Sequence, residues 1–364
     1  MDDALAKAAH VIQAGPRDSV KYSLLAAGWP SSHVDGYLKK AFRNLDKGVI
    51  IRMQGVAKSF GAKTVLSQVN IDIRSGELFG LIGMSGTGKT TLLNILVGFI
   101  KPDAGDVQVS LADGTTQSVV TNRDGVKSRI GFSTQTPSFY PRLTVRENIE
   151  HFARLYGLEE PDLSARCNAL LDLVGLFAAK EVVANHLSGG MQKRLDIACA
   201  LINDPAILIL DEPTADLDPV LRKQLWDLIR QINAKGTTIL LASHFLTEVE
   251  LLCTRIAILQ DGAVREQGTA EELRNLYSTQ YEFGLQTYSQ EYKRLLGELS
   301  HVKKFWSKAG VEDGELVIET AAPEGLLAFL AGRVRKGELQ SLHVTRPTLG
   351  RVFEQLVNNK GVIK

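Results

Sequence analysis

The chain has 364 residues, 44% of them hydrophobic and 23% charged, which is the balance of a globular protein with a sizeable core and room for about two or three domains. Because 42 basic residues stand against 41 acidic ones, the net charge of +1 argues against an extended nucleic-acid surface, and no nucleic-acid partner is expected. No run approaches the roughly 18–20 apolar residues of a membrane-spanning helix and no signal peptide opens the chain, so we expect a cytoplasmic protein.

Residues 1–47 are predicted to form a small N-terminal helical extension. Apolar residues recur there at helical intervals of three or four positions, for example at Val34, Leu38, Phe42 and Leu45. The sequence leaves open whether this extension is an interaction module or only caps the protein.

From residue 48 to residue 273 the pattern changes to strands that alternate with helices. The runs Ile207–Leu210 and Thr238–Ala242 are short and continuously apolar, which is typical of parallel strands covered by helices on both faces. Residues from about 140 to 190 lack such runs and have a mostly helical pattern. We therefore expect an α/β domain with a helical subdomain inserted at about 140–190.

Residues 274–364 are predicted to form a C-terminal α+β accessory domain. Its expected strands are Tyr281–Gln286, Glu315–Glu319 and Leu342–Val344, and its expected helices are Gln290–Leu299, Pro323–Val334 and Leu349–Leu356. This order fits a small domain of the split-βαβ kind.

A glycine-rich loop follows the apolar run Leu78–Ile82. The segment Gly83–Thr90 matches the pattern Gly-x4-Gly-Lys-Thr, and a helical pattern continues from Thr91. Glycines let successive backbone N–H groups turn towards phosphate oxygens, and the helix that follows adds its positive end. Lys89 would then hold the β- and γ-phosphates and the Thr90 hydroxyl would coordinate Mg²⁺. The alternative, a glycine-rich turn without a ligand, is disfavoured by the strand–loop–helix context.

Two acids follow the apolar run Ile207–Leu210. An acid at the carboxyl end of a buried parallel strand lies beside the phosphate loop in this architecture. Asp211 would hold the magnesium shell, and Glu212 would orient or deprotonate the attacking water. Strands that end at solvated acids are common, so the two acids alone are a weak signal. Together with the phosphate loop they are a strong indication of a nucleotide-hydrolysing site.

Ser188, Gly189 and Gly190 open another predicted helix. Their hydroxyl and bare N–H groups would suit an anion, although the same residues taken alone fit an ordinary helix cap. With this segment in place, the sequence resembles the ATP-binding cassette (ABC) ATPases over about residues 49–273, with every family element in order. The resemblance implies a P-loop cassette with a RecA-like core and a helical subdomain.

The resemblance also implies a role for each matching residue, although a lone aromatic, glutamine or histidine would more simply belong to the core or the surface. Phe60 matches the aromatic that stacks on adenine, Gln135 the glutamine that meets the metal and the water, and His244 the switch histidine. The cofactors implied are ATP and Mg²⁺. The catalytic residues would be Glu212, His244 and Gln135, and the metal-binding residues Thr90, Gln135 and Asp211. The nucleotide-binding residues would be Phe60, Gly83, Met84, Ser85, Gly86, Thr87, Gly88, Lys89, Thr90, Thr91, Ser188, Gly189, Gly190 and Asp218, the last in the dimer-contact loop.

In this family the phosphate loop of one subunit faces the signature segment of another, which Ser188–Gly190 match in this chain, so the resemblance implies a head-to-tail dimer of the chain with itself or a homologue. It also implies a separate transmembrane permease, which would hold the chain at the inner face of the membrane. The segment Arg346–Phe353 resembles the C-terminal end of multidrug and antibiotic-exporter ATPases, which favours an exporter. The alternatives are an importer subunit and a soluble ABC protein that acts on ribosomes or DNA.

Overall fold

A computed structural model describes residues 48–110, 115–277, 281–288, 292–300, 306–312, 314–345, 349, 350 and 353. The helices expected in residues 1–47, and most of the one expected over Leu349–Leu356, lie outside this set. The chain divides into two compact units. The first runs to His244 and resumes over Leu252–Arg265, and the second contains Phe245–Leu251 and the residues from Glu266 onwards.

The first unit is built on a six-stranded sheet in the order β10-β9-β3-β8-β7-β6. Its strands are β3 (Leu78–Ile82), β6 (Ile130–Ser133), β7 (Ile207–Asp211), β8 (Thr238–Ser243), β9 (Arg255–Gln260) and β10 (Ala263–Gly268). Every residue of β3, β7 and β8 is buried, as expected for parallel strands covered on both faces. Because Ile82 pairs with Ser243 and Ala242 pairs with Asp211, the carboxyl ends of β3, β8 and β7 meet at one edge of the sheet.

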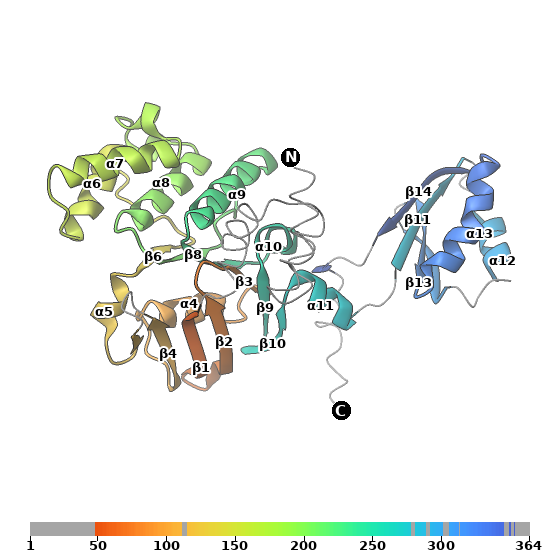
Figure 1. Cartoon of the computed structure of the whole chain (residues 1–364), viewed down its shortest axis with the longest axis horizontal. Helices are drawn as coiled ribbons and strands as arrows, with labels where there is room; N and C mark the ends of the chain where they lie inside the picture. Colours follow the sequence, from red (N-terminus) through yellow and green to blue (C-terminus); the bar gives the residue numbers. More distant parts are fainter. Residues whose placement is uncertain are drawn as a thin grey trace, which may run out of the picture. The chain divides into compact units, whose positions relative to one another are not determined.

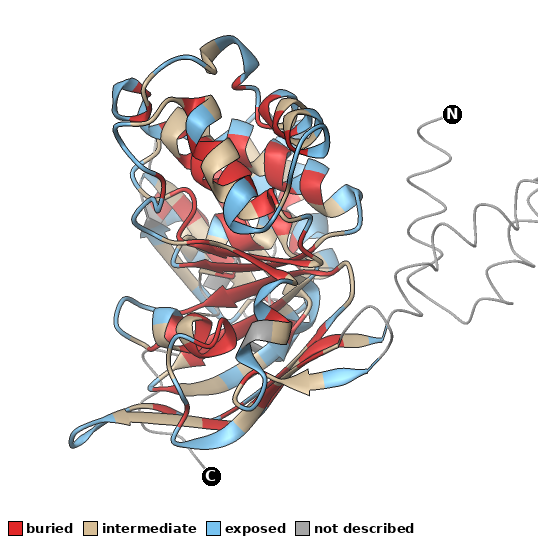
Figure 2. Cartoon of the chain, turned by 90° about the vertical axis from the view of Figure 1, so that its left-hand side faces the viewer, coloured by how far each residue is buried: buried red, intermediate tan, exposed pale blue. Residues whose placement is uncertain are grey.

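A four-stranded antiparallel sheet lies below the parallel one, in the order β2-β1-β4-β5 (Figures 1 and 2). Its strands are β1 (Val49–Phe60), β2 (Lys63–Arg74), β4 (Ala104–Ser110) and β5 (Thr116–Ser118), and the short helix α5 (Arg123–Lys127) follows. Helix α4 (Lys89–Leu96) buries Leu92, Leu93, Ile95 and Leu96 in one hydrophobic core with side chains of both sheets. This core fixes the start of α4, where the phosphate loop ends.

Helices gather on the other side of the parallel sheet (Figure 1). They are α6 (Val145–Leu155), α7 (Asp162–Leu173), α8 (Gly189–Leu201) and α9 (Pro219–Ala234), with 3-10 turns at Phe177–Ala179 and Ala184–His186. The helical segment expected at about 140–190 is therefore present as α6, α7 and the two turns. Helix α6 begins with a capping box in which Thr144 and Glu147 exchange hydrogen bonds. Among the residues described, no helix combines the length and the apolar character needed to cross a membrane.

The second unit contains α10 (Leu246–Leu252) except for its last residue, α11 (Ala270–Tyr277) and an α+β fold. That fold runs β11 (Tyr281–Thr287), α12 (Tyr292–Ser300), β12 (Lys308–Glu312), β13 (Glu315–Thr320), α13 (Pro323–Arg335) and β14 (Leu339–Thr345). The antiparallel sheet has the order β12-β13-β11-β14, which is the arrangement of a split-βαβ domain. The described strands and the helices α12 and α13 correspond to those expected before residue 346, with β12 in addition.

One face of this second sheet packs against the two helices. Phe283, Leu285, Leu316 and Ile318 alternate along β11 and β13 and form a core with side chains of α12 and α13, including Leu326. Strand β12 escaped sequence prediction because Lys308–Glu312 has only one β-branched residue and a glycine at its centre. The hydrophobic core of this fold is separate from that of the first unit.

Candidate nucleotide-binding site

The phosphate loop links β3 to α4, and two of its glycines have no room for a side chain. A Cβ atom at Gly83 would lie 2.5 Å from the Leu259 carbonyl oxygen, and one at Gly88 would lie 2.9 Å from the Val65 carbonyl oxygen. Gly88 also has a φ of 106°, which L-residues rarely adopt. The backbone therefore turns tightly into the first turn of α4, where N–H groups have no partner within the helix. Such a turn presents donors to an anion.

Lys89 begins α4 and points back into the loop. Its side chain is 7% exposed, and its Nζ donates a hydrogen bond of 2.8 Å to the Gly83 carbonyl oxygen. The same Nζ lies 3.4 Å from Oε1 of Glu212. The loop thus surrounds a nearly buried positive charge, which suits a ligand with several negative charges.

Thr90 and Asp211 join the phosphate loop to the carboxyl end of β7. The Thr90 hydroxyl donates a 2.9 Å hydrogen bond to Oδ2 of Asp211. Asp211 is 1% exposed, its other oxygen Oδ1 is buried without a hydrogen-bond partner, and burial raises the pKa of its carboxyl. A buried oxygen left without a partner is costly, and a carboxylate beside a hydroxyl is a donor set that Mg²⁺ accepts. The residues present therefore fit a magnesium ion.

Glu212 holds a strained backbone position at the end of β7. Its φ is 48°, and its N–H donates to the Ala242 carbonyl oxygen of β8 at 2.9 Å. Its carboxylate Oε2 lies 2.7 Å from Nδ1 of His244 and accepts the His244 backbone N–H at 3.2 Å. A nearly buried carboxylate is thus held between Lys89 and His244, beside the phosphate loop. Strain of this kind is found at functional sites, and the position suits a general base.

Phe60 and Gln135 are surface residues of the first unit. Phe60 ends β1 with 50% of its surface exposed, so it does not belong to the core. The Nζ of Lys58 lies 5.5 Å from the centre of its ring. Gln135 follows β6 and is exposed. Both side chains are therefore accessible to a ligand, as the predicted roles require.

Ser188 and Asp218 both cap helices. The Ser188 hydroxyl accepts the N–H of Met191 at the start of α8, and Asp218 accepts two N–H groups at the start of α9. The two helix starts are close together, since a Cβ atom at Gly190 would lie 3.2 Å from the Leu221 side chain. Among the described residues, no hydrogen bond or ion pair joins Ser188 or Asp218 to the phosphate loop of the same chain. The hydrogen bonds of these two residues are made to the starts of their own helices.

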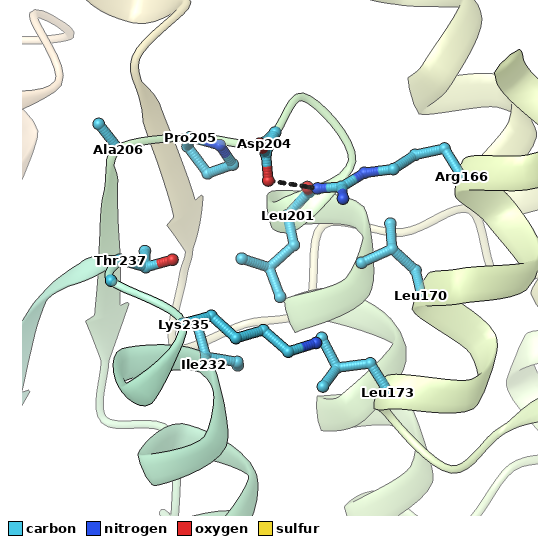
Figure 3. Close-up of a pocket in the computed structure, with 11 residues that line it drawn as sticks. Arg166, Leu170, Leu173, Leu201, Asp204, Pro205, Ala206, Ile232, Lys235 and Thr237 are labelled. Carbon is cyan, nitrogen blue, oxygen red and sulfur yellow. Dashed lines mark hydrogen bonds and ion pairs between the residues drawn. The ribbon is translucent and has the colours of Figure 1, made fainter.

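A separate pocket of about 250 Å³ lies where β7 and β8 begin, the opposite edge of the sheet (Figure 3). Arg166 of α7 donates hydrogen bonds to the carbonyl oxygens of Leu201 and Ile202 at the end of α8 and pairs with Asp204 at 2.9 Å. Lys235, at the end of α9, also lines the pocket. None of the predicted site residues does. The pocket therefore has no part in the phosphate-binding arrangement.

The site combines a phosphate loop that has a buried lysine with two carboxylates, one beside a hydroxyl and one beside a histidine. This combination defines a P-loop nucleotide-binding ATPase. The family model described as "ABC transporter" matches residues 66–215, a range that includes the loop, Asp211 and Glu212. The chain belongs to the ABC transporter family, as its ATP-binding ATPase component.

Relatives and solved structures support this assignment. The chain is 38% identical to the Nod factor export ATP-binding protein I of Bradyrhizobium diazoefficiens, over 61% of this chain and 71% of that protein. It is 34% identical to the protein of the same name from Burkholderia lata, over 78% of this chain and 90% of that protein. An ATP-binding cassette solved as a dimer in a post-hydrolysis state, bound to ADP and Pi, matches with a TM-score of 0.54 and 28% identity, over 60% of this chain and 98% of that one.

Proposed function

We propose that the chain powers export through a separate transmembrane permease, at the inner face of the membrane. The relatives whose names specify export support this direction, and one of them aligns over 90% of its own length. The observation that carries an energy-supplying role is the contact of the nearly buried Lys89 and Glu212 side chains with each other and with the half-exposed His244, beside the phosphate loop. We further propose that residues 48–273 are the working cassette, 1–47 an extension and 274–364 an accessory domain.

The chemistry proposed is phosphoryl transfer from ATP to water. Lys89 and the loop N–H groups would bind the β- and γ-phosphates, and Phe60 would stack on the base. Thr90, Asp211 and Gln135 would hold Mg²⁺, which supplies charge neutralisation at the phosphates when bound. Glu212 would orient the water and accept its proton at the carboxylate. His244 would keep that carboxylate in place through its 2.7 Å contact.

A second copy is needed to complete the site. Ser188 and Gly189 are exposed at the N-terminus of the 13-residue helix α8, where N–H groups and the helix dipole favour an anion. We propose that they close over the γ-phosphate held by the loop of another subunit, with Asp218 at the contact. The matching cassette solved as a dimer with ADP and Pi supports this arrangement. ATP would then join two subunits, and they would separate after hydrolysis, once the phosphate has left.

Coexpression with a candidate transmembrane permease tests the proposed function. The chain is expected to sediment with membranes when that protein is present and to stay in the supernatant when it is absent. Vesicles containing both proteins should accumulate or release a substrate only with ATP, and the direction separates exporter from importer. Sedimentation with ribosomes or DNA at moderate salt, and no dependence on the membrane protein, would overturn the transporter proposal in favour of a soluble ABC protein.

A further inference from the structure

Helix α8 carries two buried charged residues, Lys193 and Asp196. Sequence analysis did not single them out, because they lie within an apolar helical pattern. Asp196 is 1% exposed and Lys193 is 6% exposed, and the two lie one turn apart on α8. Charged side chains are almost never this deeply buried unless they have partners. The sequence signal that could have found them is the interruption of the run Leu195–Ala198 by an aspartate.

The partners of Asp196 are the two ends of one loop. Its Oδ2 accepts the Ser133 hydroxyl at 2.5 Å, at the last residue of β6. Its Oδ1 accepts both the backbone N–H of Ser138 at 2.8 Å and the Ser138 hydroxyl at 3.0 Å. One carboxylate therefore fastens residues 133 and 138, and Gln135 lies between them.

Lys193 contacts the same loop at Thr134, the residue before Gln135. Its Nζ donates a 2.7 Å hydrogen bond to the Thr134 carbonyl oxygen and lies 4.0 Å from Oδ2 of Asp196. Burial lowers the pKa of this lysine, while the nearby carboxylates of Asp196 and Asp211 oppose that effect. The Thr134 hydroxyl in turn donates to the Thr136 carbonyl oxygen, which closes the turn around Gln135.

Within one subunit, these contacts connect the segment proposed to face the partner's ATP with the segment proposed to face the subunit's own ATP. Ser188 caps the start of helix α8 and would meet the nucleotide of the partner, whereas Gln135 would serve the nucleotide held by its own chain. We propose that Asp196, assisted by Lys193, is a positioning residue on α8 that holds the loop around Gln135 in place. Closure of the dimer at Ser188 would then affect hydrolysis at the phosphate loop of the same subunit. This inference rests on the proposed function.

Asp196→Asn is the sharpest variant because it keeps the side-chain size and replaces one acceptor oxygen by a donor that faces Ser133 or Ser138. We expect kcat for ATP to fall about ten- to a hundredfold, as for a catalytic group displaced by up to about 1 Å, while the Kd for ATP changes less than about twofold. The matched control is Asp204→Asn, an exposed aspartate beyond the other end of α8, for which wild-type turnover is expected.

A double-mutant cycle with Gln135→Ala separates positioning from simple destabilisation. If Asp196 acts through Gln135, Asp196→Asn should reduce kcat less than about twofold in the Gln135→Ala background. Equal reductions in both backgrounds, or wild-type kcat in folded Asp196→Asn, would overturn the inference. If Asp196→Asn fails to fold, Ser133→Ala, which removes one hydroxyl donor, is measured in the same cycle with the same criteria. Absence of hydrolysis by the wild-type chain would instead count against the proposed function.

Discussion

Replacing Glu212 with glutamine is expected to lower ATP turnover by at least about 100-fold while ATP binding is retained. A positioned general base contributes about 10²–10⁴-fold to a rate, and glutamine keeps the size of the side chain without its basicity. Binding should survive because the substitution removes a negative charge from beside the phosphates and leaves Lys89 and the loop intact. Phosphate release over time and ATP binding by calorimetry measure the two effects separately.

The control for this variant is Glu181→Gln, which also exchanges a glutamate for its amide. Glu181 is largely exposed and lies 3.6 Å from Arg146 in the helical segment, away from β7. Its turnover should match that of the wild type. Wild-type turnover by Glu212→Gln would remove Glu212 from the role of base, whatever its position beside His244.

Replacing Lys89 with alanine is expected to weaken ATP binding by at least about thirtyfold, equivalent to about 2 kcal/mol, and to abolish measurable turnover. The reason is that Lys89 places a nearly buried cation inside the phosphate loop, where its attraction to phosphate is poorly screened by water. Its loss also leaves the Glu212 carboxylate without its cationic neighbour. Titration with a fluorescent ATP analogue gives the change in Kd.

Lys235→Ala is the matched control for that loss of charge. Lys235 is exposed and lines the pocket at the opposite edge of the sheet (Figure 3), so ATP affinity should be unchanged. Unfolding midpoints of both variants show whether the fold is intact. A folded Lys89→Ala protein that binds ATP within about twofold of the wild type would contradict the assignment of the phosphate loop.

The sequence alone predicted the elements whose signals are local. The apolar runs Ile207–Leu210 and Thr238–Ala242 correspond to strands that are each longer by one residue, and the helical segment at about 140–190 is present. The sequence also predicted that the phosphate loop and Asp211 lie next to each other, because the carboxyl ends of parallel strands meet at the same edge of a sheet.

Other features depend on contacts between distant parts of the chain. The positive φ of Glu212 has no local signal, since glutamate has no preference for that conformation. The hydrogen bond between Ser133 and Asp196 joins residues 63 positions apart, so neither side chain is marked by its neighbours in sequence. Strand β12 owes its existence to pairing with β13, which compensates for its weak propensity.

The proposal that ATP joins two copies of the chain is tested most directly by the molar mass of the Glu212→Gln variant in solution. Light scattering with ATP and Mg²⁺ should give about twice the 39.8 kDa of one chain, and ADP should give the single-chain mass. A Ser188→Arg substitution added to this variant should keep the single-chain mass with ATP as well. Equal masses with ATP and ADP, or an ATP dimer that survives Ser188→Arg, would contradict the account.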